Sequence, residues 1–424
     1  MKSELDSLME AGGLDALLVV GPAAHNPAMV YFTGRVHIGD GFLLKRKGEP
    51  PVLYCIPMER EEAARTGLAY RLIQWAPFSK QAEGDAIQAE ALLYQHILSE
   101  NGVTGNVAVH GLAEAGPAFA AFQRVAERMP QVHLRGESGT ASALRQARVT
   151  KDAAEVDRIR QMGKLTVEAV QEVVDFLTSQ RADGDRLVDR SGEPVTVGDV
   201  KRRIRLFLAE RGAEMPEGMI LTVGRDAGVP HNAGQDGDPI LLGAPVLLDL
   251  YPCQAGGGYF YDFTRTWCLG HVPDPVAQTY ALVLNAHLQA LASIRPGVTA
   301  RSLQEQTCDL FESHGHPTLR SDPTTMTGYV HSLGHGVGLA IHEPPSFRAG
   351  AEGEEALRPG MVFAIEPGLY YPERGLGMRI EDTVWLRPDG QPEVLADYSR
   401  DLLLPVRPRR ATARKPARRG SRSS

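Results

Sequence analysis

The chain of 424 residues contains little cysteine, and its four thiols are scattered. Cys55, Cys253, Cys268 and Cys308 include no Cys-x-x-Cys pair. Disulfide-stapled secreted domains and thiol-rich zinc modules both need more numerous or more closely spaced cysteines. We therefore expect reduced thiols, no disulfide framework and a cytoplasmic protein.

Long hydrophobic runs are also missing. No apolar stretch reaches the roughly 18 residues that a membrane-spanning helix needs. The N-terminal residues, Met-Lys-Ser-Glu-Leu-Asp, lack the apolar core of a signal peptide. We therefore expect no membrane partner.

Positive charge is scarce outside the last part of the chain. The formal net charge is −7, yet the segment from Arg407 carries eight Lys or Arg residues and no acid. Subtracting these eight charges leaves the body, residues 1–406, at −15. So acidic a body is a poor nucleic-acid binder, and we expect no nucleic-acid partner for it. The basic tail, residues 406–424, is rich in Arg, Pro, Ala and Ser, and we expect it to be disordered.

Hydrophobic content of 43% and charged content of 23% are ordinary for a globular protein, and the length allows two domains. Residues 1–146 alternate between strand and helix patterns and predict a smaller α/β domain. A helix over 151–179, with Thr150 as its N-cap, opens a larger domain over 147–405, and a polar loop follows at 181–194. The predicted fold class is α/β (α+β). Further strands are expected near 17–20, 30–34, 41–44, 52–56, 107–110, 219–223, 245–251, 256–267, 361–368 and 378–385, and helices near 83–101, 115–129, 197–211, 275–294 and 299–314.

Histidine is concentrated in one stretch. Three of the 13 histidines, His331, His335 and His342, lie within HSLGHGVGLAIHE. Clustered imidazoles are typical of metal binding or proton transfer, although a His-rich surface loop is the simpler alternative.

Four acids in apolar, strand-like runs accompany this histidine stretch. Asp249 and Asp262 precede it, and Glu366 and Glu381 follow it. A buried acid is costly unless it is paired or bound to metal, and few arginines lie close to these acids in the sequence. Two divalent cations would neutralise four carboxylates, and a pair of metals sharing a hydroxide is a recurrent hydrolytic arrangement. Oxygen ligands with one imidazole favour Mn²⁺ or Co²⁺ and also admit Zn²⁺. Strand-end acids held in salt bridges are the non-catalytic alternative.

Five motifs in order give the chain a family resemblance. They are PHNAG at 230–234, DFTRT at 262–266, HSLGHGVGLAIHE at 331–343, EPGLY at 366–370 and RIEDT at 379–383. Residues from about 147 to 400 resemble the pita-bread metallopeptidases, the family of methionine aminopeptidase, aminopeptidase P and prolidase. LDALLVV and YFTGR in the front part resemble the creatinase-type N-terminal domain of the proline-specific branch.

The resemblance implies a ligand set for two divalent metal ions, most favourably Mn²⁺. Asp249 would bind one metal, and Asp262 and Glu381 would bridge both. His335 and Glu366 would complete the second site. Glu366 would also act as general acid and base.

The resemblance also implies roles for residues around the metals. His231 and His342 would contact the scissile carbonyl and stabilise the oxyanion. His331 would line the substrate site, and Arg379 would brace the bridging carboxylates. Arg265 in DFTRT is expected to be structural.

The implied reaction is hydrolysis of the bond between an N-terminal residue and proline, in Xaa-Pro dipeptides or longer Xaa-Pro peptides. The alternatives are a non-catalytic pita-bread binding protein and an amidinohydrolase-like homologue, and retention of all five ligands argues against both. Relatives with this front domain are commonly dimers or tetramers, so we expect a homodimer or homotetramer.

Two features depart from the family pattern. Asp249 and Asp262 are 13 positions apart, two more than is usual in the family. A two-residue insertion keeps the strand face because side chains alternate with period two, so we expect the ligands to survive. Prolidases often carry an arginine soon after the HExP segment, where this chain has Ser346, with Arg348 close by. Dipeptidase and aminopeptidase specificity therefore both stay open.

Overall fold

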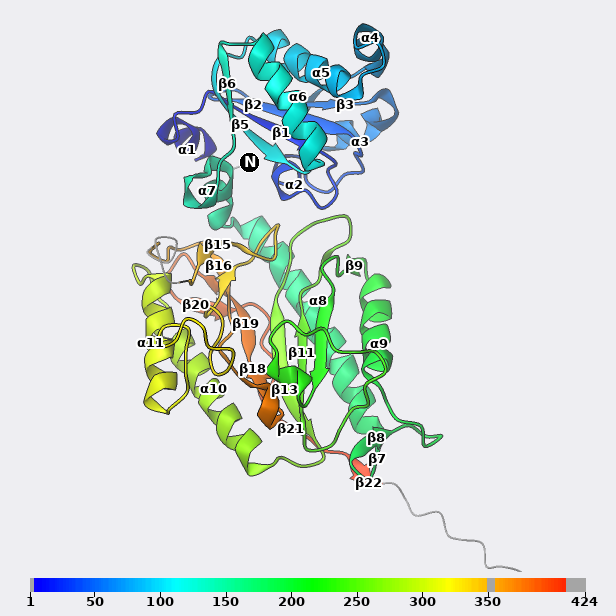
Figure 1. Ribbon diagram of the computed structural model, residues 1–424, viewed down its shortest axis with the longest axis vertical. Helices are drawn as coiled ribbons and strands as arrows, with labels where there is room; N and C mark the ends of the chain where they lie inside the picture. Colours follow the sequence, from blue (N-terminus) through cyan, green and yellow to red (C-terminus); the bar gives the residue numbers. More distant parts are fainter. Residues whose placement is uncertain (1–3, 349–354, 409–424) are drawn as a thin grey trace, which may run out of the picture.

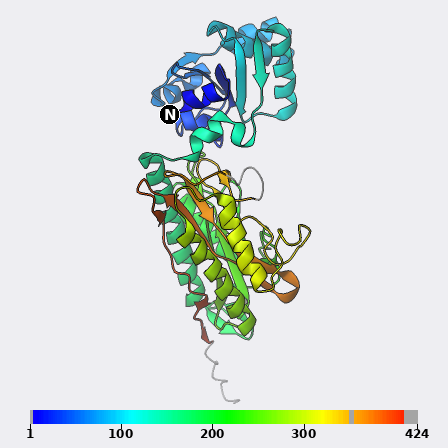
Figure 2. The same cartoon turned by 90° about the vertical axis from the view of Figure 1, so that its left-hand side faces the viewer.

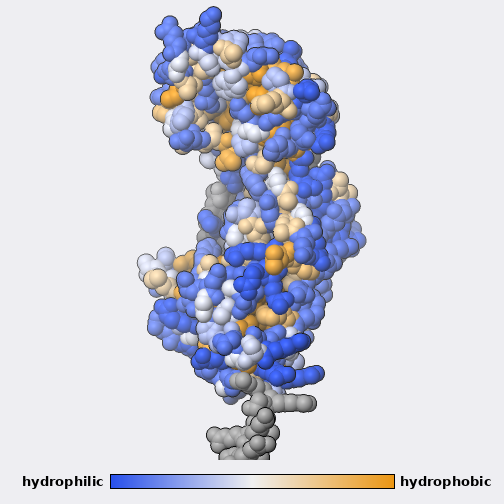
Figure 3. Space-filling view, turned by 90° about the vertical axis from the view of Figure 1, so that its right-hand side faces the viewer, coloured by the Kyte–Doolittle hydropathy of each residue, from blue (hydrophilic) through white to orange (hydrophobic). Residues whose placement is uncertain are grey.

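The computed structural model describes residues 4–348 and 355–408, which form two bodies stacked along the long axis of the molecule (Figure 1). Figure 2 shows that the bodies meet through a narrow region near the helix that ends the first one. The space-filling view in Figure 3 shows a mostly hydrophilic face that narrows at the same level. Within the described ranges, no helix has both the length and the apolar character needed to cross a membrane.

The first body is built on a six-stranded mixed sheet. Across the sheet the strands are β4 (Ala69–Leu72), β3 (Val52–Cys55), β2 (Gly41–Arg46), β1 (Ala16–Gly21), β5 (Gly105–Gly111) and β6 (Val132–Arg135). Its helices are α1 (Leu5–Ala11), α2 (Pro27–Thr33), α3 (Arg60–Arg65), α4 (Trp75–Gln81), α5 (Ala86–Glu100), α6 (Ala115–Arg128) and α7 (Ala143–Val149).

The central strand β1 is apolar on both faces because helices cover both faces. Leu18 and Val20 join a core with α5 and α6, whereas Leu17 and Val19 join a second core with α1 and α7. A strand buried on both sides needs this continuous apolar run instead of alternation with polar residues.

The prediction of a strand over residues 30–34 is wrong, because Val30 lies in helix α2. The side chain of Asn26 accepts a hydrogen bond from the Met29 amide at 3.3 Å, and Pro27 occupies the first helical turn. Gly34, with φ of 65°, ends the helix. A capping residue, an N-terminal proline and a terminal glycine together outweigh the β-propensity of a few residues.

The second body is built on a nine-stranded sheet that faces helices of the same body (Figure 1). The main path runs through β10 (Met219–Val223), β11 (Pro245–Leu250), β13 (Phe263–Leu269), β19 (Glu381–Leu386), β16 (Val362–Ile365), β14 (His335–Gly336) and β15 (Glu343–Ser346). Strands β20 (Pro392–Val394) and β21 (Leu403–Leu404) pair with β19 and β13, and β17 (Gly368–Tyr371) pairs with β18 (Leu376–Arg379). The helices are α8 (Ala153–Ser179), α9 (Val197–Ala209), α10 (Asp274–Ser293) and α11 (Ala300–Ser313).

The first helix of this body begins later than the sequence predicted, because Asp152 and not Thr150 is its N-cap. The Asp152 side chain accepts from the Glu155 amide, and the Glu155 side chain accepts from the Asp152 amide, which completes a capping box. Thr150 instead forms a β-bridge with Met361.

Two segments expected to lack regular structure contain short strands. Within the predicted loop 181–194, β7 (Arg181–Asp183) and β8 (Arg186–Val188) form a hairpin. The first residues of the predicted disordered tail, Arg407–Pro408, form β22 and pair with β7. The remaining tail, residues 409–424, lies outside the described residues.

Candidate active site

Strand alternation separates a structural face from a polar face in the second sheet. On β11, Val246, Leu248 and Leu250 pack into the core that includes α8 and α9. Asp249 lies on the opposite face, as the alternation of strand side chains requires.

Acidic side chains from three neighbouring strands share this polar face. Asp249 is the register partner of Thr264 on β13, and Thr264 is the partner of Glu381 on β19. Asp262 lies two positions before Thr264 and therefore points to the same face. The 13-residue spacing is compatible with this arrangement, and the segment between the two acids contains the short strand β12 (Cys253–Gln254).

An imidazole and a fourth carboxylate approach from the adjoining strands. Nε2 of His335, at the start of β14, lies 3.4 Å from Oδ2 of Asp262 and 3.5 Å from Oε1 of Glu366. Glu366 directly follows β16. The structure thus brings together all five residues that the sequence selected as metal ligands.

Two carboxylate oxygens of this cluster lack hydrogen-bond partners among the described residues, and this bears on whether the cluster suits a metal ion. Oδ1 of Asp249 and Oε1 of Glu381 are buried and have no hydrogen-bond partner among the described residues. Ligand atoms of Asp262, His335 and Glu381 all lie within 4.8 Å of one another. A buried carboxylate oxygen without a partner costs free energy, and a divalent cation would satisfy both oxygens. Oxygen donors with one imidazole suit a hard or borderline divalent ion.

Without a cation, the crowded site retains protons. Burial raises the pKa of Asp249 to about 6, although Arg379 opposes the shift. Burial also raises the pKa of Glu366 to about 7, against the charges of His335 and Arg379. Burial lowers the pKa of His335, but the hydrogen bond to Asp262 and the charge of Glu366 outweigh it and raise that pKa to about 9.

Arg379, predicted to brace the carboxylates, makes contacts with each of its three nitrogens. Nη2 donates to Oδ2 of Asp249 at 2.5 Å, Nε donates to Oγ1 of Thr264 at 3.1 Å, and Nη1 donates to the Tyr370 hydroxyl at 2.9 Å. The Thr264 hydroxyl in turn donates to Oε2 of Glu381 at 2.7 Å. Thr264 and Tyr370 were not selected from the sequence, although both lie inside the quoted motifs DFTRT and EPGLY.

The three other predicted histidines line one cavity with the acids. This cavity of about 1290 Å³ includes His231, His331 and His342 in its wall. Burial and the charge of Arg379 lower the pKa of His231, and burial with nearby His335 lowers that of His342 to about 4. Both imidazoles are therefore neutral at pH 7, and each can donate one N–H to an oxygen in the cavity.

His331 is held more firmly than its neighbours. Its Nδ1 lies 2.8 Å from the Ser332 carbonyl oxygen, and its Nε2 lies 2.8 Å from the Tyr370 hydroxyl. Burial lowers its pKa to about 3, so the ring is neutral at pH 7. Nδ1–H therefore donates to the carbonyl, and Nε2 accepts from Tyr370, whose oxygen accepts from Arg379.

Arg265, expected to be structural, lies fully buried behind the polar face. Its Nη2 donates to Oδ1 of Asp382 at 2.8 Å, and its Nη1 donates to the Glu381 carbonyl oxygen at 2.8 Å. Burial raises the pKa of Asp382, but Arg265, His287 and Arg400 outweigh it and hold that pKa well below its usual range. These buried ion pairs fix the backbone that carries Glu381.

Several cationic side chains line the cavity, and most of them lie in no motif that the sequence analysis used. They are Arg145, Arg301, Arg320 and Arg348, and Ser346 lies in the same wall. Arg320 is bound to Asp309 and Glu312, and Arg301 to Glu305. Arg145 and Arg348 have no carboxylate of the described residues within ion-pair distance.

Comparison with known proteins identifies the family of the chain. Residues 157–388, more than half of the chain, match the model of metallopeptidase family M24, and residues 2–147 match the creatinase/prolidase N-terminal domain. The chain is 33% identical to the probable dipeptidase PepE of Mycobacterium tuberculosis over 247 residues, and this match spans 58% of each protein. It is 26% identical to the Xaa-Pro dipeptidase of Pyrococcus furiosus over 407 residues, covering 95% of this chain and all of that protein.

The fold is shared with solved structures. The prolidase from Pyrococcus furiosus superposes with a TM-score of 0.72 at 24% identity, over 93% of this chain and 100% of that one. The match to the family model, together with the two-body architecture, establishes that this chain belongs to metallopeptidase family M24 and carries a creatinase/prolidase N-terminal domain.

Proposed function

We propose that the protein is a dinuclear metal-dependent exopeptidase that hydrolyses the bond between an N-terminal residue and proline. The observation that carries this proposal is the face of three buried carboxylates, one partly buried carboxylate (Glu366) and one imidazole. On this face, Oδ1 of Asp249 and Oε1 of Glu381 lack partners among the described residues. Family membership makes divalent-metal dependence and a peptide substrate the expected chemistry.

The five clustered residues would hold the two metal ions. Asp249 would bind one ion, Asp262 and Glu381 both ions, and His335 and Glu366 the other ion. Mn²⁺ suits this donor set best, and Co²⁺ or Zn²⁺ also fits it. When bound, the ions would polarise the scissile carbonyl and lower the pKa of a water molecule so that it becomes a nucleophile.

The protein's own groups would move the protons and stabilise charge. Glu366 would take a proton from the attacking water and deliver it to the leaving proline nitrogen, a role that suits a carboxyl whose pKa lies near 7. His231 and His342, both neutral, would donate hydrogen bonds to the carbonyl oxygen as it gains negative charge. Arg379 would hold Asp249 in place, and His331 would present a fixed wall to the substrate.

Proline specificity suits this cavity chemically. The bond before proline is a tertiary amide with no N–H, so a protease cannot grip it through that donor. Arg348 and Arg145 add positive charge to the cavity wall, which favours a substrate with a nearby carboxylate. The Xaa-Pro dipeptidase of Pyrococcus furiosus, which aligns along nearly the whole chain, supports the dipeptide as substrate.

Hydrolysis assays on metal-stripped protein test the proposal. An Xaa-Pro dipeptide and an Xaa-Pro-Yaa tripeptide are each assayed with added Mn²⁺, Co²⁺ or Zn²⁺, and Arg348→Gln and Ser346→Ala serve as a matched pair. We expect dipeptide cleavage that needs metal, and a higher KM for the dipeptide in Arg348→Gln only. Equal or better cleavage of the tripeptide would indicate an aminopeptidase P-like enzyme. Metal binding without cleavage of either peptide would favour the non-catalytic pita-bread protein.

Assembly and location stay predictions. We propose a homodimer or homotetramer, which light scattering on the purified protein tests directly. We also propose a cytoplasmic location, in keeping with four cysteines that form no disulfide among the described residues.

A further inference from the structure

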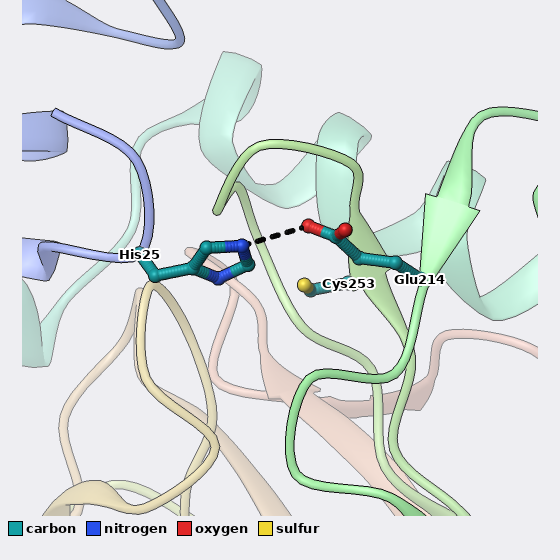
Figure 4. A group of neighbouring side chains, drawn as sticks. All are labelled: His25, Glu214 and Cys253. Atoms are coloured by element: carbon teal, nitrogen blue, oxygen red, sulfur yellow. Dashed lines mark ion pairs between the residues drawn. The ribbon is translucent and has the colours of Figure 1, made fainter. Parts of the chain in front are cut away.

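A second cluster of metal-ligating side chains lies where the two bodies meet, away from the catalytic cavity. It consists of His25 from the first body and Glu214 and Cys253 from the second (Figure 4). None of the three lines the cavity that holds the five acidic and imidazole ligands. The close-up shows the imidazole and the carboxylate pointing toward each other, with the thiol beside them (Figure 4).

The geometry of the cluster follows from one strand pair and one loop. Strand β9 (Ala213–Glu214) pairs with β12 so that Cys253 is the register partner of Glu214. His25 follows β1 in a left-handed backbone conformation, with φ of 54°, in which histidine is enriched. Its Nε2 lies 3.1 Å from Oε1 of Glu214, and the three ligand atoms all lie within 4.8 Å of one another.

The loop after β12 fixes both sides of the cluster. A Cβ placed on Gly257 would lie 2.2 Å from the His25 backbone nitrogen, so only glycine allows this approach. The Gly256 amide donates to Oε1 of Glu214 at 2.7 Å, and Nη1 of Arg35 donates to the Ala255 carbonyl oxygen at 2.9 Å.

We propose that His25, Glu214 and Cys253 form a binding site for one zinc-class divalent ion that links the two bodies. Thiolate, imidazole and carboxylate together are a zinc donor set, in contrast to the oxygen-rich catalytic cluster. Neighbouring ligands of a tetrahedral zinc lie roughly 3.3–3.6 Å apart for ordinary bond lengths. The His25–Glu214 distance is already close to this value. Both side chains are more than a third exposed, so they can close on the buried thiol while water takes the fourth position.

Charge and proton balance are consistent with a divalent ion. Burial and the neighbouring carboxylate of Glu214 raise the pKa of the Cys253 thiol to about 12, so the thiol is protonated at neutral pH. Binding releases that proton, and the thiolate and carboxylate then neutralise the two positive charges of the ion. Affinity for the ion should therefore rise with pH.

Cobalt titration of the full-length protein tests the site, because a cysteine thiolate bound to Co²⁺ gives a charge-transfer absorption in the near ultraviolet. The donors of the catalytic cluster include no thiolate, so that cluster cannot produce this band. We expect the band to level off at the intensity of one thiolate-bound Co²⁺ per chain, in addition to the ions held by the catalytic cluster, and to disappear when Zn²⁺ displaces Co²⁺. The variant Cys253→Ser should lose the band and bind one metal ion fewer, whereas Cys268→Ser, a buried thiol outside the cluster, should keep both.

Two further variants keep the test decisive if Cys253→Ser does not fold. Glu214→Gln preserves the acceptor for the Gly256 amide, and His25→Asn suits the left-handed backbone. Each should weaken Co²⁺ binding at the band at least tenfold. The proposal would be overturned if the wild-type protein gave no band or if Cys253→Ser kept it. Unchanged Co²⁺ affinity in the other two variants would also overturn it. The three residues would then be an ion pair beside a core thiol.

Discussion

Two interior strands, β1 of the first sheet and β11 of the second, use burial in different ways. In the first body, β1 directs Leu18 into one hydrophobic core and Leu17 into another. In the second body, β11 buries Leu248 in a hydrophobic core and Asp249 on the opposite face. Both strands are almost fully buried, so burial alone does not separate framework from function. The two strands differ in that the second sheet carries a buried polar face opposite its apolar core, and the candidate site lies on that face.

The largest effect should come from changing the polar face itself. Glu366→Gln removes the proposed proton acceptor and one charge from the proposed ligand set, and we expect hydrolysis to fall by roughly 10²–10⁴-fold. Steady-state assays at saturating Mn²⁺ measure this loss, with the melting temperature as the check on folding. Glu373→Gln, at an exposed glutamate, serves as the control and should retain full activity. A Glu366→Gln enzyme with more than a tenth of wild-type activity would contradict the assigned role.

The matching change in the first sheet should affect stability and leave chemistry intact. Leu18→Ala opens a cavity in a fully buried core, and we expect a loss of about 2–5 kcal/mol in the free energy of unfolding. Urea denaturation measures the loss, and kcat per folded molecule should stay at the wild-type value. The exposed Leu206→Ala is the control. A drop in kcat comparable to that of Glu366→Gln would contradict the view that the first sheet contributes stability and not chemistry.

Arg379 tests whether the contacts behind the carboxylates matter for metal binding. A lysine cannot reproduce three separate contacts to Asp249, Thr264 and Tyr370, so Arg379→Lys should weaken metal affinity by about 10–100-fold. Metal titration followed by activity measures the change. Arg387→Lys makes the same substitution at an exposed ion pair and should have no effect. Equal affinity in both variants would show that Arg379 does not position the ligands.

The smallest effect expected is a pH slope in the metal-free protein. The pKa of His335 is raised from 6.5 to about 9, so the stability it contributes is complete below pH 6.5 and is lost as the pH rises through 9. The raised pKa of Glu366 acts in the same direction up to about pH 7. The lowered pKa values of His331 and His342 act below pH 6.5, outside this window. The metal-free protein should therefore melt at lower temperature at pH 9 than at pH 6.5.

A second variant isolates the source of this slope. Metal-free His335→Gln lacks the titrating imidazole and should show a flatter dependence of melting temperature on pH between 6.5 and 9. Added metal should stabilise the wild-type protein more at the higher pH, because the ion replaces protons that the site has then lost. Equal slopes in the two metal-free proteins would exclude His335 as the cause.

The sequence could reveal the acids of the site because each lies in a short apolar run with a recognisable neighbourhood. Strand alternation then suffices to place Asp249, Asp262 and Glu381 on one face. Arg145 and Arg320 could not be found in this way, since they come from segments without a local motif and reach the cavity only through tertiary packing. The cluster of His25, Glu214 and Cys253 could not be predicted for the same reason, because His25 lies nearly two hundred residues from Glu214 in the sequence.

The fold was predictable where long periodic segments dominate and less so where short signals compete. Helices such as α6 and α10 lie within a residue or two of their expected ranges. The β-prone side chains around Val30 favour a strand, whereas the cap at Asn26 and the proline after it favour the helix that forms. Thr150 and Asp152 are both plausible caps, and the Glu155 partner decides between them.

The most direct test of the central claim is a Mn²⁺ titration of metal-free protein, in which bound ions and hydrolysis of an Xaa-Pro dipeptide are measured together. Cys253→Ser protein is used so that the cluster of His25, Glu214 and Cys253 does not bind a further ion, and the same protein with Asp262→Asn is the comparison. The proposed dinuclear centre predicts that two Mn²⁺ ions bind per chain and that activity appears as they bind. The Asp262→Asn variant should lose the two bound ions and the activity. Dipeptide hydrolysis by the metal-free protein, or fewer than two bound ions at full activity, would contradict the account.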